Sequence, residues 1–448
     1  MNLPTQLTIN PGHPLRGSYT LPGDKSLSHR GALFAALAEG ESYIKNFLVA
    51  GVTRAMLDAL TMLGVSWRLE ENMLYVCSHG LSGWQGGYQP LDCGNSATTL
   101  RLLAGALAAA GIPAVLDGTP GLRRRPMDRI VIPLRQMGVP IEASISGTAP
   151  LVLYQRPRNQ PLASLNYTLP VASAQVKTCL LLSALAASAP STLSEPGPSR
   201  DHTERMLRAM GVQVESTIIK NAYITYLVPP VQVKLKPLNV MLPGDISTAA
   251  FLIVAALITP GSEIRLCNIG LNPTRTGLLE VLGSMGAQIE IHPGGEQGGE
   301  PAGDLVVHHS KLQATTVSGT MVVRMIDEFP AFALAAAFAQ GETVVSEAGD
   351  LRNKESDRIS ALVSELAKLG VEASEIQDGF SIHGGRLPSA GQVEAHGDHR
   401  LAMALALAGL AGQGQVTVIG AQIIAESFPD FPSVLRSLGA DIREGFGP

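Results

Sequence analysis

The feature that most constrains this chain is an internal repeat. Six times, an amphipathic stretch ends in Met or Leu followed by Gly, and a stretch of alternating apolar and polar residues begins there. The closing glycines lie 69 to 84 residues apart: Gly64, Gly138, Gly211, Gly286, Gly370 and Gly439. Glycine directly after an amphipathic helix is a common C-cap, and alternation is typical of a half-buried strand. We therefore predict six repeats of helices and short strands in a mixed α/β fold.

A tetrapeptide that occurs twice divides these repeats into two groups of three. Residues 21–24 and 242–245 both read Leu-Pro-Gly-Asp, and each precedes an expected helix. Proline fixes φ and lacks an N–H, which suits a stiff connection, and Gly-Asp supplies a turn followed by a helix N-cap. We predict two lobes, one of residues 22–240 and the other of residues 1–21 plus 241–448, joined by two crossover strands.

Composition excludes several classes of protein. The chain has 448 residues, of which 45% are hydrophobic and 4% aromatic, and its formal net charge is −5. An acidic chain with few aromatic residues does not predict nucleic-acid binding. The longest purely apolar run, residues 249–258, is about half as long as a membrane span, and no Lys or Arg precedes Arg16 to mark a signal peptide. We expect a cytoplasmic protein that does not enter a membrane.

The cysteines and histidines form no recognisable metal motif. Cys77, Cys93, Cys179 and Cys267 are scattered, with no C-x-x-C pair, and four cysteines in so long a chain are no disulfide framework. We expect them to be buried, reduced thiols. The ten histidines include no H-E-x-x-H sequence, and the pair His308-His309 is expected on the surface. We predict no metal ion at the functional site.

Each repeat also places a polar cluster at the start of one helix. The clusters are Gly23-Asp24-Lys25-Ser26, Gly94-Asn95-Ser96, Ser173-Ala174-Gln175, Gly244-Asp245-Ile246-Ser247, Asp327-Glu328 and Gly397-Asp398-His399-Arg400. One interpretation is that Asp24, Asn95, Ser173, Asp245, Asp327 and Asp398 are ordinary N-caps. The other is that these helix N-termini, each with a partial charge of about +0.5, converge on an anion.

Seven cations in loops or first turns favour the second interpretation. They are Lys25, Arg30, Arg125, Arg200, Lys354, Arg358 and Arg400. A cation in the first turn of a helix, as expected for Lys25 and Arg400, opposes the helix dipole. An anionic ligand removes this conflict, although any single arginine, such as Arg200, is also compatible with a solvated surface.

At this point the residues carry a resemblance to a known family. The motifs are Leu-Pro-Gly-Asp-Lys-Ser-Leu-Ser-His-Arg at 21–30, Gly-Asn-Ser-Ala-Thr at 94–98, Arg-Pro-Met at 125–127, Ala-Ser-Ala-Gln-Val-Lys at 172–177, Asn-Pro-Thr-Arg at 272–275, Lys-Glu-Ser-Asp-Arg at 354–358 and Asp-His-Arg at 398–400. In this order, over about residues 15 to 445, they resemble 5-enolpyruvylshikimate-3-phosphate (EPSP) synthases. The resemblance implies two inside-out α/β barrel lobes. It also implies transfer of enolpyruvyl from phosphoenolpyruvate to the 5-hydroxyl of shikimate 3-phosphate, in aromatic amino-acid biosynthesis, without a cofactor.

The resemblance assigns roles residue by residue. Nine residues would bind shikimate 3-phosphate: Lys25, Ser26, Arg30, Ser173, Ala174, Gln175, Arg200, Asp327 and Lys354. Seven would bind phosphoenolpyruvate: Lys25, Asn95, Ala97, Arg125, Gln175, Arg358 and Arg400. Asp327 would accept the hydroxyl proton, Glu355 would handle protons at the enolpyruvyl methylene, and Lys25 would bridge both substrates as a third catalytic residue.

Two positions distinguish this chain within the family. Many relatives have Gly where it has Ala97, and the resemblance to the glyphosate-insensitive second class implies that the extra methyl group weakens binding of glyphosate. Many relatives also have, at the position of Glu426, a Lys on the phosphoenolpyruvate side. The resemblance does not carry that contact over to this chain, and Glu426 is not counted in the site.

Two alternatives remain, and each has a discriminating feature. The sister enzyme that acts on UDP-N-acetylglucosamine shares the repeat but uses a loop Cys before its Arg-Pro motif, whereas residues 118–125 contain no Cys. A non-catalytic anion-binding relative would be favoured by changes at Asp327, Lys354 or Glu355, and all three are present. We expect the protein to act as a monomer.

Overall fold

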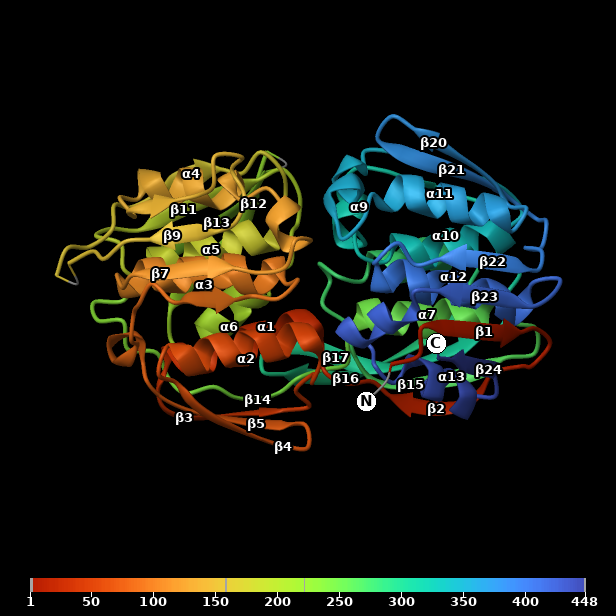
Figure 1. Cartoon of the computed structure of the whole chain (residues 1–448), viewed down its shortest axis with the longest axis horizontal. Coiled ribbons are helices and arrows are strands. Elements are labelled where there is room, and N and C mark those ends of the chain that lie inside the picture. The colour runs from red at the N-terminus through yellow and green to blue at the C-terminus, as the bar shows by residue number, and fades with distance from the viewer. Residues whose placement is uncertain (1–2, 158, 221, 447–448) are drawn as a thin grey trace. The chain divides into compact units, whose positions relative to one another are not determined.

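The computed structural model describes residues 3–157, 159–220 and 222–446, and the chain divides into two compact units. The central unit comprises Gly23–Pro243 and Glu296–Glu300; the discontinuous unit comprises Met1–Pro22, Gly244–Gly295 and Pro301–Pro448. Among the described residues the strands form six four-stranded sheets, three in each unit (Figure 1). The predicted mixed α/β fold is confirmed.

The three sheets of the central unit share one topology. In spatial order they are β14 (Asn239–Met241), β3 (Glu39–Lys45), β5 (Met73–His79) and β4 (Ser66–Glu70); β6 (Pro90–Asp92), β7 (Ala114–Asp117), β9 (Leu151–Leu153) and β8 (Ile141–Glu142); and β10 (Asn166–Thr168), β11 (Ser191–Glu195), β13 (Ala222–Val228) and β12 (Gln213–Ile219). In each sheet the first two strands are parallel and the other pairings are antiparallel. The sequence repeat is therefore a structural repeat.

Helices occupy the inside of this unit, and the sheets lie outside them (Figure 1). The inner helices are α1 (Lys25–Leu37), α3 (Ala97–Ala110) and α5 (Ala174–Ala184), and the outer ones are α2 (Gly51–Met62), α4 (Asp128–Gln136) and α6 (His202–Ala209). Inner helices have almost no polar face because neighbours cover them on all sides. At Gly105 of α3, a Cβ atom would lie 2.3 Å from the Cys179 carbonyl oxygen of α5, so only glycine permits this packing.

The discontinuous unit repeats the plan. Its sheets are β16 (Gln288–Gln297), β17 (Glu300–His308), β15 (Glu263–Gly270) and β2 (Arg16–Thr20); β18 (Thr316–Val317), β19 (Gly341–Val345), β21 (Gly379–Gly384) and β20 (Glu372–Ile376); and β22 (Gly391–Glu394), β23 (Val416–Ile419), β1 (Gln6–Asn10) and β24 (Asp441–Gly445). The inner helices are α7 (Ile246–Ile258), α10 (Phe329–Phe338) and α12 (His399–Ala411). The remaining helices are α8 (Gly277–Ser284), α9 (Thr320–Arg324), α11 (Arg358–Lys368) and α13 (Phe431–Ser437). Every residue of α7 is buried, which explains the long apolar run in the sequence.

The part of the chain that the structure describes also has four short 3₁₀ helices: η1 (Leu81–Gly83), η2 (Leu122–Arg124), η3 (Gly349–Asn353) and η4 (Ala421–Glu426). All six closing glycines have positive φ, between 73° and 112°, as expected for glycines that follow a helix. No helix within residues 3–157, 159–220 and 222–446 is both long and apolar enough to span a membrane.

The two Leu-Pro-Gly-Asp segments exchange edge strands between repeats. β2 precedes α1 in the chain but pairs with β15, whereas β14 precedes α7 but pairs with β3. Gly23 is needed at the first of these segments because a Cβ atom there would lie 1.8 Å from the Asn46 carbonyl oxygen. A hydrogen bond also joins the two tetrapeptides: the Pro243 carbonyl accepts from the Asp24 N–H at 2.9 Å.

The cysteine prediction needs one correction. Cys93 and Cys179 are buried free thiols, and Cys267 is half-buried, but Cys77 is exposed. Cys77 lies on β5, where buried and outward-facing residues alternate, and it falls on the outward face.

Candidate functional site

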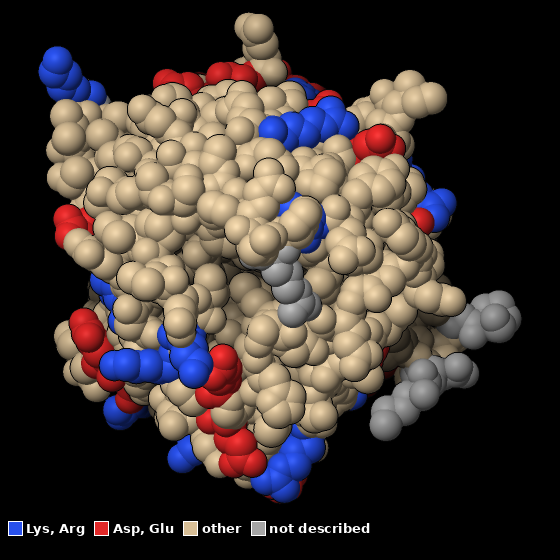
Figure 2. All heavy atoms as spheres, turned by 90° about the vertical axis from the view of Figure 1, so that its left-hand side faces the viewer, with Lys and Arg blue, Asp and Glu red and all other residues tan. Residues whose placement is uncertain are grey.

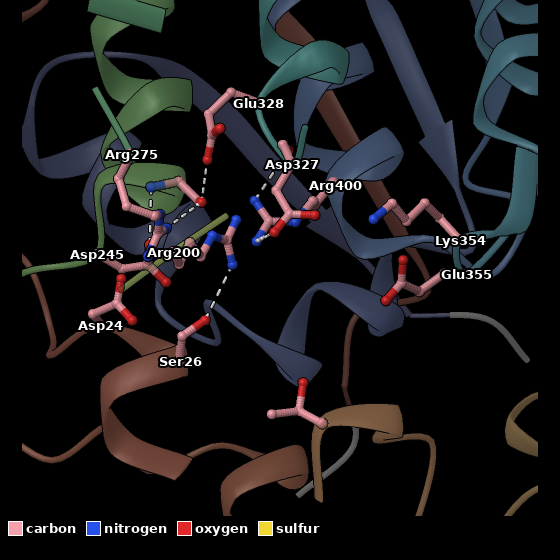
Figure 3. Close-up of polar contacts among 12 residues, drawn as sticks. Asp24, Ser26, Arg200, Asp245, Arg275, Asp327, Glu328, Lys354, Glu355 and Arg400 are labelled. Atoms are coloured by element: carbon pink, nitrogen blue, oxygen red, sulfur yellow. Dashed lines mark hydrogen bonds and ion pairs between the residues drawn. The ribbon is translucent and has the colours of Figure 1, made fainter. Parts of the chain in front are cut away.

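The start of α1 gathers three of the predicted site residues of the central unit. Asp24 caps the helix, because its Oδ1 accepts a hydrogen bond from the Leu27 N–H at 2.8 Å. Lys25 and Ser26 are the first two helical residues and are half-buried. Arg200, just before α6, donates from Nη1 to the Ser26 Oγ at 3.2 Å (Figure 3). The structure thus brings residues from the first and third repeats together.

Arg30 lies one turn further along α1 and is buried. It donates from Nη1 to the Ser26 carbonyl at 3.1 Å, from Nη2 to the Thr178 Oγ1 at 2.8 Å and from Nε to the Thr203 Oγ1 at 2.9 Å. Burial, and then the nearby Arg200, lower the pKa of Arg30 to about 10, so the guanidinium is charged at neutral pH. Arg30 therefore holds the first turn of α1 in place, and its buried guanidinium group adds a positive charge close to that turn.

The second and third repeats supply two further helix starts. Ser96 caps α3 by accepting from the Thr99 N–H at 3.1 Å, so Asn95 precedes the cap and Ala97, which is buried, begins the helix. Ser173 caps α5 by accepting from the Val176 N–H at 3.5 Å, and Ala174 and Gln175 begin that helix.

Arg101 was missed by the sequence analysis although it contacts predicted site residues. Its Nη1 donates to the Gln175 Oε1 at 2.6 Å, and its Nη2 donates to the Pro126 carbonyl at 2.9 Å. Gln175 in turn donates to the Thr98 Oγ1 at 2.9 Å. Arg125, directly before Pro126, is half-buried at the end of η2. A signal was available, because Arg101 is the one charged residue in the α3 sequence.

In the discontinuous unit, Arg358 lies among three carboxylates. Its Nη2 is 2.7 Å from the Glu355 Oε2, its Nη1 is 3.6 Å from the Asp327 Oδ1, and its Nε is 2.7 Å from the Asp398 Oδ2. Arg400 also contacts Asp327, at 3.3 Å to the backbone carbonyl and 4.0 Å to the carboxylate. The structure therefore brings together four residues predicted for the site.

Asp398 is the buried counter-ion of this cluster. It caps α12 by accepting from the Arg400 N–H at 2.9 Å, and it also binds Arg358. Burial alone would raise the pKa of Asp398, but Arg358 lowers it overall. Burial would likewise lower the pKa of Arg358, but Asp398, Glu355 and Asp327 raise it. Both groups are thus held in their charged forms.

Lys354 extends its ammonium group toward Asp327 and Arg400 in Figure 3. It also forms an ion pair with Asp350 at 3.4 Å. Glu426, which replaces the lysine of many relatives, is half-buried at the end of η4.

A hydrogen-bond network reaches Glu328, the residue that follows Asp327. Arg275 donates from Nη2 to the Asp245 Oδ1 at 3.0 Å and to the Ser247 Oγ at 2.6 Å, and Ser247 donates to Glu328, the N-cap residue of α10 (Figure 3). Because Glu328 follows Asp327 directly, this network fixes the backbone next to the predicted proton acceptor. The sequence motif at 272–275 had suggested no role for Arg275.

The N-cap interpretation of the helix starts holds for four of the six residues. Asp24, Ser173, Asp245 and Asp398 are N-caps with side-chain hydrogen bonds. Asn95 and Asp327 are not caps, because Ser96 and Glu328 occupy those positions. On the face of the central unit shown in Figure 2, by contrast, basic and acidic side chains are scattered over a largely uncharged surface.

Comparison with solved structures places this fold among the enolpyruvyl transferases. The enolpyruvyl transferase NikO from Streptomyces tendae superimposes with a TM-score of 0.79 over 100% of both chains, at 20% identity. An EPSP synthase from Acinetobacter baumannii superimposes with a TM-score of 0.85, covers 98% of this chain and 100% of its own, and is 38% identical.

Sequence comparison is more specific. The family model for EPSP synthase (3-phosphoshikimate 1-carboxyvinyltransferase) matches residues 9–435. The 3-phosphoshikimate 1-carboxyvinyltransferase of Coxiella burnetii (strain RSA 493) is 44% identical, with 97% of each chain covered. That of Xanthomonas campestris pv. campestris is 45% identical, with 96% of each covered. The chain belongs to the EPSP synthase family.

Proposed function

We propose that this protein transfers the enolpyruvyl group of phosphoenolpyruvate to the 5-hydroxyl of shikimate 3-phosphate and releases phosphate. The observation that carries the proposal is the cluster around Arg358, where Asp327 and Glu355 lie 3.6 Å and 2.7 Å from one guanidinium group. The reaction needs one group that accepts a proton and another that supplies one. Two carboxylates beside a cation that can bind an anionic substrate meet this need.

The central unit would bind most of shikimate 3-phosphate. Its phosphate and carboxylate require cations and N–H donors, which Lys25, Arg200 and the α1 and α5 N-termini offer. The hydrogen bond from Arg200 to Ser26, at 3.2 Å, supports this assignment because it holds two of the predicted ligands together. Arg30, Ser173, Ala174 and Gln175 complete the set there, with Asp327 and Lys354 at the reacting hydroxyl.

Phosphoenolpyruvate would bind to Lys25, Asn95, Ala97, Arg125, Gln175, Arg358 and Arg400. Guanidinium groups suit its phosphate and carboxylate because they donate two parallel hydrogen bonds. The three-carboxylate surroundings of Arg358 keep that residue charged and fixed in position before any substrate binds.

The proton steps follow from these positions. Asp327 takes the proton of the 5-hydroxyl as its oxygen attacks C2 of phosphoenolpyruvate, and C3 gains a proton to become a methyl group. In the second step the C2–phosphate bond breaks, and the methyl group returns one proton as the double bond re-forms. Glu355 is the group assigned to proton transfer at that carbon, and Lys25 stabilises the charge on the phosphate that leaves.

We further propose that the protein belongs to the class with low sensitivity to glyphosate. Ala97 supports this, because its methyl group is buried at the start of α3, where the resemblance places phosphoenolpyruvate. Glyphosate is slightly longer than phosphoenolpyruvate and would meet that methyl group. Action as a monomer in the cytoplasm, with no nucleic acid, remains part of the same proposal.

The decisive test is phosphate release by the purified protein from phosphoenolpyruvate, with shikimate 3-phosphate or UDP-N-acetylglucosamine as the acceptor. Release with shikimate 3-phosphate alone is expected. Release with the sugar nucleotide, or with neither acceptor, would overturn the proposal. The variant Asp327→Asn should lose about 100-fold or more in kcat, whereas Glu342→Gln, at an exposed position of β19, should keep the full rate.

A further inference from the structure

His29 joins two helix starts of the central unit and has no assigned role. It lies on α1, one turn after Lys25, and is only 1% exposed. Its Nδ1 is 2.8 Å from the Lys25 carbonyl oxygen. Its Nε2 is 3.2 Å from the Ser96 Oγ and 3.1 Å from the carbonyl oxygen of Val52 in α2. One imidazole ring therefore contacts the first turn of α1 and the N-cap of α3.

The imidazole of His29 is neutral, and both of its nitrogens have polar partners. Burial, with Lys25 and Arg30 nearby, lowers the pKa of His29 to about 4, so the ring is neutral at physiological pH. A neutral imidazole has one N–H donor and one acceptor nitrogen. Each ring nitrogen faces a carbonyl oxygen, Nδ1 that of Lys25 and Nε2 that of Val52. In either tautomer the Ser96 hydroxyl can pair with Nε2, as the donor to a bare nitrogen or as the acceptor from its N–H.

Ser96 connects His29 to the first turn of α3. Besides its contact with His29, the Ser96 Oγ accepts from the Thr99 N–H at 3.1 Å and from the Thr99 Oγ1 at 2.9 Å. Asn95 and Ala97, the residues on either side, are both assigned to phosphoenolpyruvate. The position of His29 therefore sets the position of that loop relative to Lys25.

We propose that His29 is a positioning residue for phosphoenolpyruvate, which holds residues 95–97 at a fixed distance from the first turn of α1. The inference rests on the proposed function, because that function assigns the loop to phosphoenolpyruvate. The hydrogen bond between His29 and Ser96 matters for binding phosphoenolpyruvate. It matters much less for shikimate 3-phosphate, which relies on α1, α5 and Arg200.

Two substitutions test the contacts of the two ring nitrogens of His29 separately. In His29→Gln, the amide group reaches the place of Nε2 and can hydrogen-bond the Ser96 hydroxyl in either orientation. In His29→Asn, the shorter amide reaches only the place of Nδ1, so the bond to Ser96 is lost. We expect the KM for phosphoenolpyruvate to rise about tenfold in His29→Asn, which corresponds to one hydrogen bond. It should return to within about twofold of wild type in His29→Gln, and the KM for shikimate 3-phosphate should stay within about twofold in both.

A double-mutant cycle with Ser96→Ala tests whether the effect passes through Ser96. In the Ser96→Ala background, His29→Asn should change the KM for phosphoenolpyruvate by less than about twofold. His79→Asn, at an exposed position at the end of β5, is the matched control and should leave both KM values unchanged.

The outcomes distinguish a failure of the proposed function from a failure of the role proposed for His29. Wild-type protein that does not turn over shikimate 3-phosphate overturns the proposed function itself. Wild-type turnover with equal changes in both KM values, with no change in either, or with additive effects in the cycle overturns the role of His29. If His29→Asn does not fold, Ser96→Ala removes the same hydrogen bond from the other side, and an unchanged KM for phosphoenolpyruvate in that variant also refutes the role.

Discussion

Replacing Lys177 by methionine is expected to destabilise the central unit by about 3–5 kcal/mol. The Lys177 ammonium group lies 2.7 Å from the Glu195 Oε1 and 2.8 Å from the Glu204 Oε1, and all three side chains are at most 4% exposed. Methionine has a similar length but no charge, so the substitution removes the ammonium group that contacts both buried carboxylates. The Oε2 atoms of both carboxylates already lack hydrogen-bond partners among the described residues.

The pH dependence of the effect has a definite sign. Burial alone would lower the pKa of Lys177, but Glu204 and Glu195 raise it above its usual value. A raised pKa means that the contribution of Lys177 is fully present below the unfolded-state value of about 10.4 and is lost only as the pH rises above it. Wild-type stability should therefore not change on this account between pH 6 and 9. The variant takes up a proton on its buried carboxylates on folding, so its free energy of unfolding should fall as the pH rises.

The assay can be confined to one unit. The chain has two tryptophans, Trp67 and Trp84, and both lie in the central unit. Urea denaturation followed by tryptophan fluorescence therefore reports the unfolding of that unit. Lys234→Met is the matched control, because Lys234 is 64% exposed in its ion pair with Glu39, and this variant should lose less than about 1 kcal/mol.

A loss of less than about 1 kcal/mol in Lys177→Met would refute the argument that the lysine neutralises two buried charges. A loss of the expected size that did not depend on pH would refute the ionic explanation and point to packing alone. Because Lys177 also donates to the Ser199 carbonyl at 3.3 Å, next to Arg200, weaker binding of shikimate 3-phosphate should accompany the loss of stability.

Three further predictions concern single positions. Ala97→Gly should lower the glyphosate concentration that halves activity by roughly tenfold or more, and an unchanged value would contradict the steric argument. Gly23→Ala should destabilise the central unit by about 2 kcal/mol or more, measured by tryptophan fluorescence, because the new Cβ would lie 1.8 Å from the Asn46 carbonyl oxygen. Asp398→Asn should lower kcat/KM for phosphoenolpyruvate by about 30-fold, because Arg358 loses its buried counter-ion; steady-state kinetics equal to wild type would show that the carboxylate charge is not needed.

Local signals in the sequence were sufficient to predict the repeating fold. The closing glycines, such as Gly64 and Gly370, end helices with positive φ, and this conformation is set by a few neighbouring residues. The individual strands that β2 and β14 pair with were beyond such reasoning. The sequence analysis assigned residues 1–21, which contain β2, to the same lobe as residues 241–448, but nothing local indicates which strand of that lobe β2 joins.

The candidate site was also predictable from the sequence only in part. Cations and caps at helix starts could be found from the sequence, because a residue such as Arg358 directly follows its own N-cap, Asp357. The partners of these residues could not. Arg101 contacts Gln175 and Pro126, which belong to other segments, and Asp398 lies 40 residues from the arginine that it neutralises. Such pairings depend on how the repeats pack, which no single repeat encodes.

The place of β1 in its sheet has a consequence for the synthesis of the chain. β1 pairs with β23 and β24, and its side chains reach residues 409 and 431 positions later, from Thr8 to Thr417 and from Asn10 to Asp441. At ribosomal rates of about 5–20 residues per second, the strand waits roughly 20 to 90 seconds for its neighbours. Every strand of the central unit is available by Met241, long before that time. The nascent chain thus carries an unpaired amphipathic strand after the strands of the central unit have been made, and chaperones that shield such strands would act on this end first.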